Sequence, residues 1–167
     1  REGEACIWIA EDYFYKGYYE NAIEYCQRGL ILNHETVDDA RTKEEQEWRY
    51  YLYQQSLSDM ADLYKAGGDY ASSLEYFEIA TQFGIERHTA WTMENEKGEI
   101  FRLMGQNDSS FYYLRKTGNM ANSWTKREIA ATYIMAKKYD SALAILKQIE
   151  PRFRKDNITG NLLPVLF

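Results

Sequence analysis

The sequence predicts an all-helical protein built from consecutive helical hairpins. Only two prolines and ten glycines interrupt 167 residues, and long stretches are rich in Ala, Leu, Glu, Lys and Gln. This composition favours helices over a β-sandwich or barrel. A pattern of fixed spacing also recurs four times: a small residue, an aromatic residue three positions on, a turn, a second aromatic residue and a second small residue. Such repetition is typical of stacked helix pairs, whose small residues let two helices touch while aromatic rings fill the space beside them.

The four copies keep this pattern to different degrees. The first two copies are complete and read Ala10, Tyr13, Gly17, Tyr19, Ala22 and Ala61, Tyr64, Gly68, Tyr70, Ser73. The other two copies read Gly98, Phe101, Gly105, Asn107, Ser110 and Ala130, Tyr133, Lys137, Tyr139, Ala142. The third copy has therefore lost one aromatic residue, and the fourth has lost its turn glycine. The copies predict hairpins at residues 3–34, 44–86, 87–118 and 120–151 of a single domain that covers residues 1–167.

In the first hairpin we expect helices at about residues 4–16 and 19–32, with Gly17 in the turn because a side chain would crowd the hairpin there. The second hairpin begins with an unusually long helix, since residues 43–66 contain neither proline nor glycine and keep an apolar stripe of helical period. Its second helix should cover residues 70–83, and Gly84 is the expected stop signal.

The third hairpin is expected at about residues 87–104 and 108–117, and the fourth at about 120–136 and 139–150. Pro151 should end the last helix, because proline lacks the amide donor that a helix interior needs. Residues 152–167 contain several large apolar side chains and could either begin a further hairpin or cap the stack.

The matching small residues Ala10, Ala61, Gly98 and Ala130 are 51, 37 and 32 positions apart, instead of evenly spaced. The first interval therefore carries an insertion, which falls on the polar and acidic segment 33–42 and on the long helix after it. Two interpretations of the segment stay open, a solvated loop and a flap that covers a binding groove. Resistance to proteolysis between residues 36 and 41 would argue against a mobile loop.

The segments Ala10–Ala22 and Ala130–Leu143 resemble tetratricopeptide repeats, whose helix pairs carry small residues at positions eight and twenty and aromatic residues at eleven, seventeen and twenty-four. The resemblance covers nearly the whole chain, although the closing proline of the family is replaced by His34 and Ile85 in the first two copies. It implies a right-handed superhelix, a solenoid of about four tetratricopeptide-like hairpins.

In this family the first helix of each hairpin lines a concave groove, so the resemblance nominates groove residues by position. The nominated partner-binding residues are Glu4, Ile7, Glu11, Phe14, Tyr15, Gln55, Asp62, Lys65, Asn95, Glu99, Arg102, Trp124 and Arg127. They imply a groove with acidic and aromatic groups at its first end and with Arg102, Arg127 and Trp124 toward its last end. We expect a peptide or partner helix of complementary charge, the alternative being that these are ordinary solvated side chains.

One subclass of the family is excluded. Members that hold the carboxylate tail of heat-shock chaperones use Lys, Asn and Arg side chains at five positions. The corresponding positions here are Ile7, Glu11, Asp59, Thr92 and Glu96. Three of these residues are acidic and none is basic, so a carboxylate would meet like charge.

No motif for catalysis, a metal or a cofactor is found. His34 and His88 lie far apart, and neither belongs to a metal-binding pattern. We therefore expect no enzyme activity, no metal and no cofactor. Cys6 and Cys26 occupy facing positions of the first hairpin; we expect two reduced, buried thiols, with a disulfide as the alternative if the helices pinch together.

The net charge of −6 and the lack of a basic cluster argue against a nucleic-acid partner, and the apolar runs are too short to span a membrane. The chain begins with Arg1, so we interpret it as a piece of a longer protein. We expect a non-enzymatic protein-interaction scaffold. Its irregular, tyrosine-rich repeats resemble helical sensor regions of bacterial signal-transduction proteins, which would be extracytoplasmic when they belong to a membrane kinase or regulator and cytoplasmic otherwise. The alternatives are a free-standing chaperone or adaptor for secreted or assembling proteins, and a self-associating stack that forms a homodimer.

Overall fold

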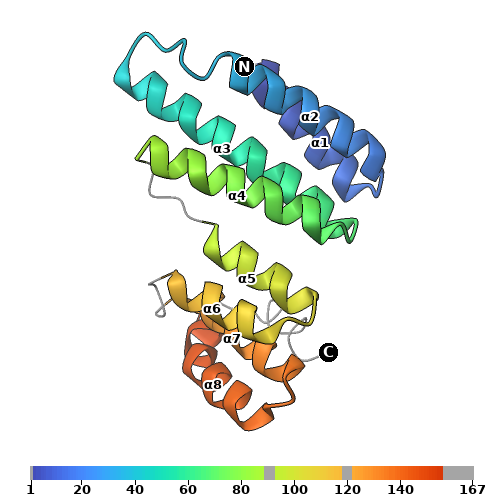
Figure 1. Ribbon diagram of the computed structural model, residues 1–167, viewed down its shortest axis with the longest axis vertical. Helices are drawn as coiled ribbons and strands as arrows, with labels where there is room; N and C mark the ends of the chain where they lie inside the picture. Colours follow the sequence, from blue (N-terminus) through green and yellow to red (C-terminus); the bar gives the residue numbers. More distant parts are fainter. Residues whose placement is uncertain (1, 89–92, 118–121, 156–167) are drawn as a thin grey trace. The chain divides into compact units, whose positions relative to one another are not determined.

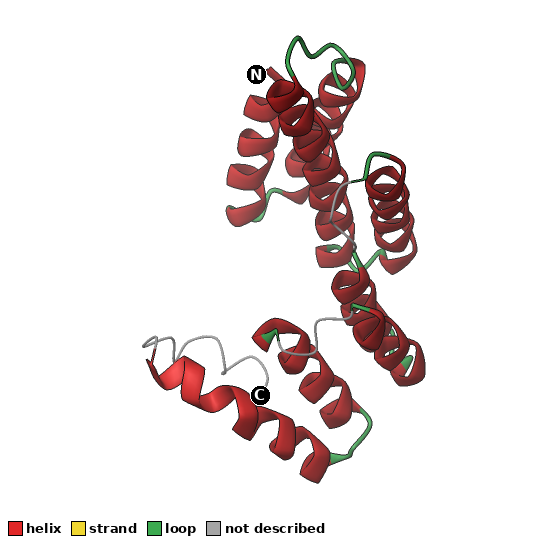
Figure 2. Ribbon diagram, turned by 90° about the vertical axis from the view of Figure 1, so that its left-hand side faces the viewer, coloured by secondary structure: helices red, strands yellow, loops and turns green. Residues whose placement is uncertain are grey.

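The computed structural model describes residues 2–88, 93–117 and 122–155, with side chains up to residue 150. In these ranges the chain forms helices and no strand (Figures 1 and 2). The helices are α1 (Glu2–Tyr15), α2 (Tyr19–Glu35), α3 (Lys43–Ala66), α4 (Tyr70–Glu86), α5 (Glu94–Leu103), α6 (Asn107–Lys116), α7 (Ser123–Met135) and α8 (Tyr139–Lys155). The predicted all-helical class is confirmed.

Consecutive helices pair into hairpins, α1 with α2, α3 with α4, α5 with α6 and α7 with α8. The hairpins group into two compact units, of which the first contains α1 to α4 and the second α5 to α8. In the first unit α3 packs on both α1 and α2, and in the second α7 packs on both α5 and α6. Each unit is thus a pair of hairpins with its own buried contacts.

The small residues of the repeat pattern lie where the two helices of a hairpin meet. Ala22, Ala61, Ser73, Ser110 and Ala130 are fully buried, and Ser73 Oγ donates a hydrogen bond of 2.7 Å to the Ala61 carbonyl of the facing helix. At Gly98 a Cβ atom would come within 2.6 Å of Leu114 Cγ, so no larger residue fits there without movement. The small residues are therefore used as the sequence predicts, to bring helices into contact.

A stacked pair of aromatic rings recurs in each of the first three hairpins. The rings of Tyr13 and Tyr25 stack with centroids 5.4 Å apart, and the rings twelve residues apart in the next two hairpins, Tyr64–Tyr76 and Phe101–Tyr113, stack at 5.6 and 5.1 Å. In the fourth hairpin the corresponding partner is an isoleucine, and Tyr133 instead contacts Phe111 of the preceding hairpin at 4.7 Å.

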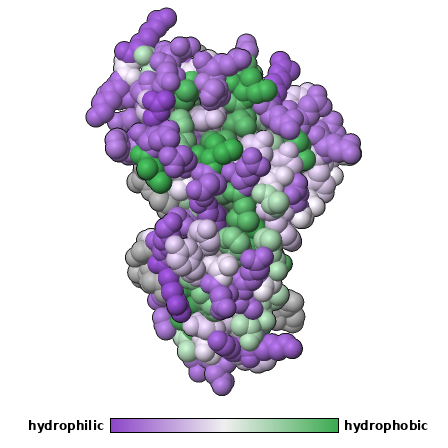
Figure 3. Space-filling view, viewed as in Figure 1, coloured by the Kyte–Doolittle hydropathy of each residue, from purple (hydrophilic) through white to green (hydrophobic). Residues whose placement is uncertain are grey.

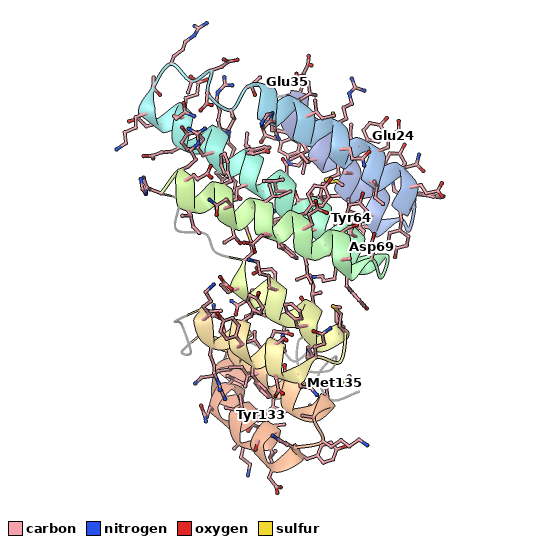
Figure 4. All side chains as sticks on the ribbon, in the orientation of Figure 1. Glu24, Glu35, Tyr64, Asp69, Tyr133 and Met135 are labelled. Atoms are coloured by element: carbon pink, nitrogen blue, oxygen red, sulfur yellow. The ribbon has the colours of Figure 1, made fainter. Side chains whose placement is uncertain are left out.

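The four hairpin turns have one geometry. In each, a backbone N–H donates to the carbonyl of the first aromatic residue five positions earlier, as Asp69 does to Tyr64 at 2.9 Å. Figure 4 labels these two residues beside the turn between α3 and α4. The residue before that donor has a positive φ, which is 81° at Gly17 and 59° at Lys137. A Cβ atom at Gly17 would meet nothing within 4 Å. The expected reason for this glycine was therefore wrong, since left-handed backbone and not crowding favours it.

Three predicted helix boundaries are wrong. Gly84 does not stop α4 but lies buried inside it, and the helix ends where Arg87 N–H bonds back to the Phe83 carbonyl and His88 turns left-handed with φ of 56°. The third hairpin begins at Glu94, not at residue 87. Pro151 does not end α8, which continues to Lys155. Proline has helical φ, but it removes one backbone hydrogen bond and its ring crowds the carbonyl four residues earlier, so it disfavours the interior of a helix without forbidding it.

The inserted segment is a loop held against the first unit. Gln46 Nε2 donates to the Val37 carbonyl, Arg49 Nη1 donates to the Thr36 carbonyl, and the side chain of Val37 is buried. Arg87, which follows α4, reaches Asp38 at 3.4 Å. These contacts hold the segment against α3 and against Arg87 after α4, and the solvated-loop and flap interpretations both stay predictions. The predicted cap or further repeat lies outside the described residues from 156 onward.

Candidate groove of the first unit

The candidate site is a cavity of about 140 Å³ in the first unit, open to solvent between α1 and α3 with α2 behind. Its lining residues are Ile7, Ala10, Glu11, Phe14, Tyr15, Cys26, Asp59, Asp62 and Leu63. Among these, Ile7, Glu11, Phe14, Tyr15 and Asp62 are residues that the resemblance nominates for the groove. The structure therefore brings together nominated residues from α1 and α3 of the first unit.

The spacing of the side chains explains how the cavity forms. Ile7, Glu11 and Phe14 follow one another at intervals of four and three residues, so they lie on one face of α1. Asp59, Asp62 and Leu63 occupy one face of α3 in the same way. Hydrophobic patches interrupt the hydrophilic surface of this unit (Figure 3).

The cavity is lined by buried apolar residues on one side and by an exposed aromatic residue at its edge. Ile7, Ala10 and Leu63 belong to the buried core of the first unit, and Phe14 packs against that core. Tyr15 is 84% exposed although it adjoins this apolar wall. The phenol of Tyr15 is therefore free to contact a second molecule while its neighbours hold α1 in place.

Three carboxylates line the cavity. Asp59 Oδ1 accepts a hydrogen bond of 2.8 Å from Gln55 Nε2, whereas Asp59 Oδ2 is buried and receives none from the described residues. Burial, with smaller effects of the nearby charges of Glu11 and Asp62, raises the pKa of Asp59 from 3.8 to about 7, although the hydrogen bond from Gln55 lowers it. Asp62 pairs with Lys65 at 2.7 Å, so the cavity carries more negative than positive charge.

The base of the cavity is uncharged. Cys26 is fully buried, and its thiol donates to the Ser56 carbonyl at 3.9 Å. Burial, with smaller effects of Asp59 and Glu11, raises the pKa of Cys26 far above its usual range, so the sulfur stays a neutral thiol. Cys6 is a buried free thiol as well, in agreement with the expectation of two reduced cysteines.

Two of the other nominated residues of the first unit contact the carboxylates of the cavity, and one lies away from it. Gln55 holds Asp59, and Lys65 holds Asp62, as described above. Glu4 lies away from the cavity and lines a separate, wide hollow of about 590 Å³ beside Asn33, Thr36, Glu45, Trp48, Arg49 and Leu52. The exposed Trp48 stacks on Tyr51 at 5.3 Å.

In the second unit, the nominated residues contact one another and the core. Arg102 Nη2 lies 3.0 Å from Glu128 Oε2, and Arg127 Nε lies 3.3 Å from Glu128 Oε1. Glu128 is buried, so both guanidinium groups neutralise an internal carboxylate. Arg102 also lies 3.8 Å from Glu99. The two arginines that the resemblance nominates for the groove are thus both paired with carboxylates of the same unit.

The remaining nominated residues of this unit are partly buried. Asn95 Oδ1 accepts a hydrogen bond of 3.0 Å from Thr125 Oγ1, which ties α5 to α7. Trp124 is half-buried at the start of α7. Thr92, one of the positions that excluded the carboxylate-binding subclass, lies outside the described residues.

Asp59 was not nominated for the groove, although it lines the cavity and its Oδ2 atom is buried. A signal was present, because Asp59 follows Gln55 by four residues and precedes Asp62 by three, on the helix face that holds both. Glu128 could not have been found this way, since its importance depends on two arginines that come from different helices.

Among residues 2–88, 93–117 and 122–155, no group of three or more His, Cys, Asp or Glu side chains lies close enough to hold a metal ion. None of the helices in these ranges combines the length and apolar character needed to cross a membrane. The acidic cavity is thus distinguished by charge and shape and not by a set of metal ligands.

Comparison with known proteins identifies the fold. No family model and no curated protein sequence matches the chain. Among solved structures, it is similar to the nearly identical TPR-like repeats of a putative kinesin light chain from Podospora anserina, with 13% identity and a TM-score of 0.53. The match covers 92% of this chain and 95% of that one. At this identity the likeness establishes the tetratricopeptide-like repeat fold.

Proposed function

We propose that this chain, a set of tetratricopeptide-like repeats, is a non-enzymatic protein-interaction scaffold that binds a peptide or partner helix along α1 and α3 of its first unit. The observation that carries the proposal is the cavity between these helices, where Tyr15 is 84% exposed beside buried Ile7 and Leu63. An exposed aromatic residue at the edge of a fixed apolar pocket is typical of the anchor points at protein interfaces.

The local chemistry supports binding over catalysis. The buried thiol of Cys26 is uncharged and already donates a hydrogen bond, so it lacks the thiolate of a reactive cysteine. The raised pKa of Asp59 alone does not make an active site, because the cavity adds only two further carboxylates and no nucleophile beside them.

The binding experiment starts from a displayed library of random dodecapeptides, selected on the immobilised wild-type chain. Affinities of the selected peptides are then measured by fluorescence anisotropy for the wild type and for Tyr15→Ala. We expect Tyr15→Ala to weaken binding roughly five- to tenfold, as loss of an aromatic anchor does. Tyr139→Ala is the matched control, because Tyr139 is 63% exposed in the second unit. If no peptide is selected, or if both variants bind equally well, the proposal fails.

We propose further, from the resemblance to sensor regions, that the scaffold serves a bacterial signal-transduction protein; a free-standing chaperone or adaptor is the alternative. The two differ in what the repeats are attached to. Sequencing the complete reading frame on both sides of the chain separates them. A kinase or DNA-binding domain would support the signalling proposal, and a short frame without one would support the adaptor. The homodimer alternative is tested by light scattering at high concentration, where a monomer excludes it.

A further inference from the structure

We infer that the cavity between α1 and α3 accepts one basic side chain, a lysine or arginine of the bound peptide, and that Asp59 is its main anchor. The inference rests on the proposed function and names the chemistry of the partner that the groove selects. It follows from the size of the cavity, the charges around it and the unmet hydrogen bond of Asp59.

The size of the cavity suits a single long side chain. Its volume of about 140 Å³ is smaller than the ~300–1,000 Å³ of ordinary small-molecule sites. Ile7, Phe14 and Leu63 form an apolar wall, against which the methylene groups of a lysine or arginine can pack. The carboxylates of the same cavity are then available to the charged end.

The charges around the cavity favour a positive charge on the side chain that enters it. Glu11 and Asp62 lie close enough to Asp59 to raise its pKa, and Cys26 contributes no charge. Lys65 is the positive group beside them, and it is paired with Asp62 at 2.7 Å. An acidic side chain of the partner would add a like charge to this cavity, whereas a basic one would offset the charge that is in excess.

The hydrogen bonds of Asp59 indicate what the cavity lacks. Gln55 Nε2 donates a hydrogen bond to Oδ1, and the buried Oδ2 atom has no donor among the residues that the structure describes. An unsatisfied buried acceptor is unfavourable unless a partner supplies a donor. Lysine and arginine have only donors at their charged ends, so either side chain can donate to the Asp59 carboxyl group in the cavity and stabilise its ionised form.

The inference is tested with the peptides selected by the groove. We expect the peptides whose binding depends on Tyr15 to share a lysine or arginine at one position. Replacing that residue by norleucine, which keeps an apolar stem without the charge, should weaken binding at least tenfold. Asp59→Asn should weaken binding of the parent peptide to a similar degree, and the norleucine peptide should bind the wild type and Asp59→Asn equally well, since the missing contact is the same.

Asp12→Asn is the matched control, because it makes the same change of charge on the exposed part of α1, where Asp12 pairs only with Lys16 in the described chain. We expect its affinities to equal those of the wild type. A second readout is the carboxyl ¹³C resonance of Asp59, whose titration should move to lower pH when the parent peptide is bound and not when the norleucine peptide is bound.

The outcomes separate this inference from the proposed function. Peptides that depend on Tyr15 but share no basic residue, or that lose nothing with norleucine, would overturn the inference while the proposed function stands. Peptides whose binding is indifferent to Tyr15, or a failure to select any, would overturn both. An equal loss in Asp12→Asn and Asp59→Asn would show a general effect of negative charge and would also overturn the assignment to Asp59.

Discussion

Asp59 holds its carboxyl group in a partly buried position where one oxygen, Oδ2, receives no hydrogen bond from the described residues. This buried acceptor without a donor suits Asp59 to bind a basic side chain, but it also lowers the stability of the folded chain. Functional sites commonly retain such groups at the expense of stability.

The pH dependence of stability should reveal Asp59. Its pKa is near 3.8 when exposed and about 7 in the folded chain, so the folded state holds the proton more tightly. Protonated Asp59 therefore makes its full contribution to the free energy of unfolding below about pH 4. As the pH rises to about 7 this contribution, on the order of 2–4 kcal/mol, is lost.

We therefore expect Asp59→Asn to raise the free energy of unfolding by about 2 kcal/mol at pH 8 and by almost nothing at pH 4. The amide retains an acceptor for Gln55 and removes the charge. Urea unfolding followed by circular dichroism at both pH values checks this, with Asp12→Asn as the exposed comparison. A variant that is equally destabilised at both pH values would contradict the assigned cause.

Lys137 occupies the turn position that the other three hairpins give to glycine, and it has φ of 59°. Left-handed backbone is unfavourable for a residue with a Cβ atom by roughly 1–2 kcal/mol, partly offset by the extra freedom of glycine in the unfolded chain. Lys137→Gly should raise the free energy of unfolding by about 0.5–1 kcal/mol.

Denaturant unfolding measures the effect of Lys137→Gly. The neighbouring Lys138→Gly is the control, because positive φ is found at Lys137 and not at Lys138. This control should be neutral or destabilising, and stabilisation of both variants would argue against the turn geometry as the cause.

Helices of the second unit are joined by buried charge. Arg102 of α5 and Arg127 of α7 both contact Glu128 of α7, whose side chain is 5% exposed. A buried carboxylate that loses its partners is strongly destabilising. Arg102 therefore joins α5 to α7, whereas Arg127 neutralises Glu128 within α7.

We expect Arg102→Met to lower the free energy of unfolding by about 1–3 kcal/mol, because Arg127 still neutralises Glu128, and the double variant with Arg127→Met to cost roughly 3–5 kcal/mol. Thermal unfolding followed by circular dichroism checks both. Lys147→Met, which removes an exposed positive charge from α8, should have little effect. If the double variant costs no more than the single one, Glu128 does not depend on this pair.

Helix α3 has the bounds that the sequence predicts, because neither proline nor glycine interrupts residues 43–66. Thr42 caps its start by accepting a hydrogen bond from Glu45 N–H, and two glycines follow its end. The end of α4 was not, because Gly84 is also a small residue of a buried helix face. A glycine can either stop a helix or allow close packing, and only the surrounding helices decide which.

The whole chain consists of two compact units, each with its own buried residues. The core of the first unit joins α1, α2 and α3, and α3 joins α4 through buried Gln54, whose side chain donates to the Ala80 carbonyl at 2.9 Å. In repeat proteins stability is approximately a sum of units and their nearest neighbours, so a unit with a complete core can fold alone.

We expect a fragment of residues 1–93 to be helical, to unfold cooperatively and to keep the peptide affinity of the full chain. A fragment of residues 1–66 is the comparison, because it leaves α3 without its partner helix and exposes the apolar face that Phe77 and Ala80 cover. Circular dichroism and anisotropy measure both properties. If residues 1–93 alone are unfolded, the first unit is not independently stable and the expectation is contradicted.

The class of fold and the hairpins could be predicted from the sequence, because they depend on short-range periodicity, with small and aromatic residues at fixed spacing. The surroundings of the charged side chains could be learned only from the folded chain. The fold made Asp59 a partly buried acid with an unmet hydrogen bond, and it turned Arg102 and Arg127 into partners of buried Glu128. The burial of Asp59 and Glu128 and the pairing of Arg102 with Glu128 depend on side chains from different helices, and spacing along the sequence carries no record of those distances.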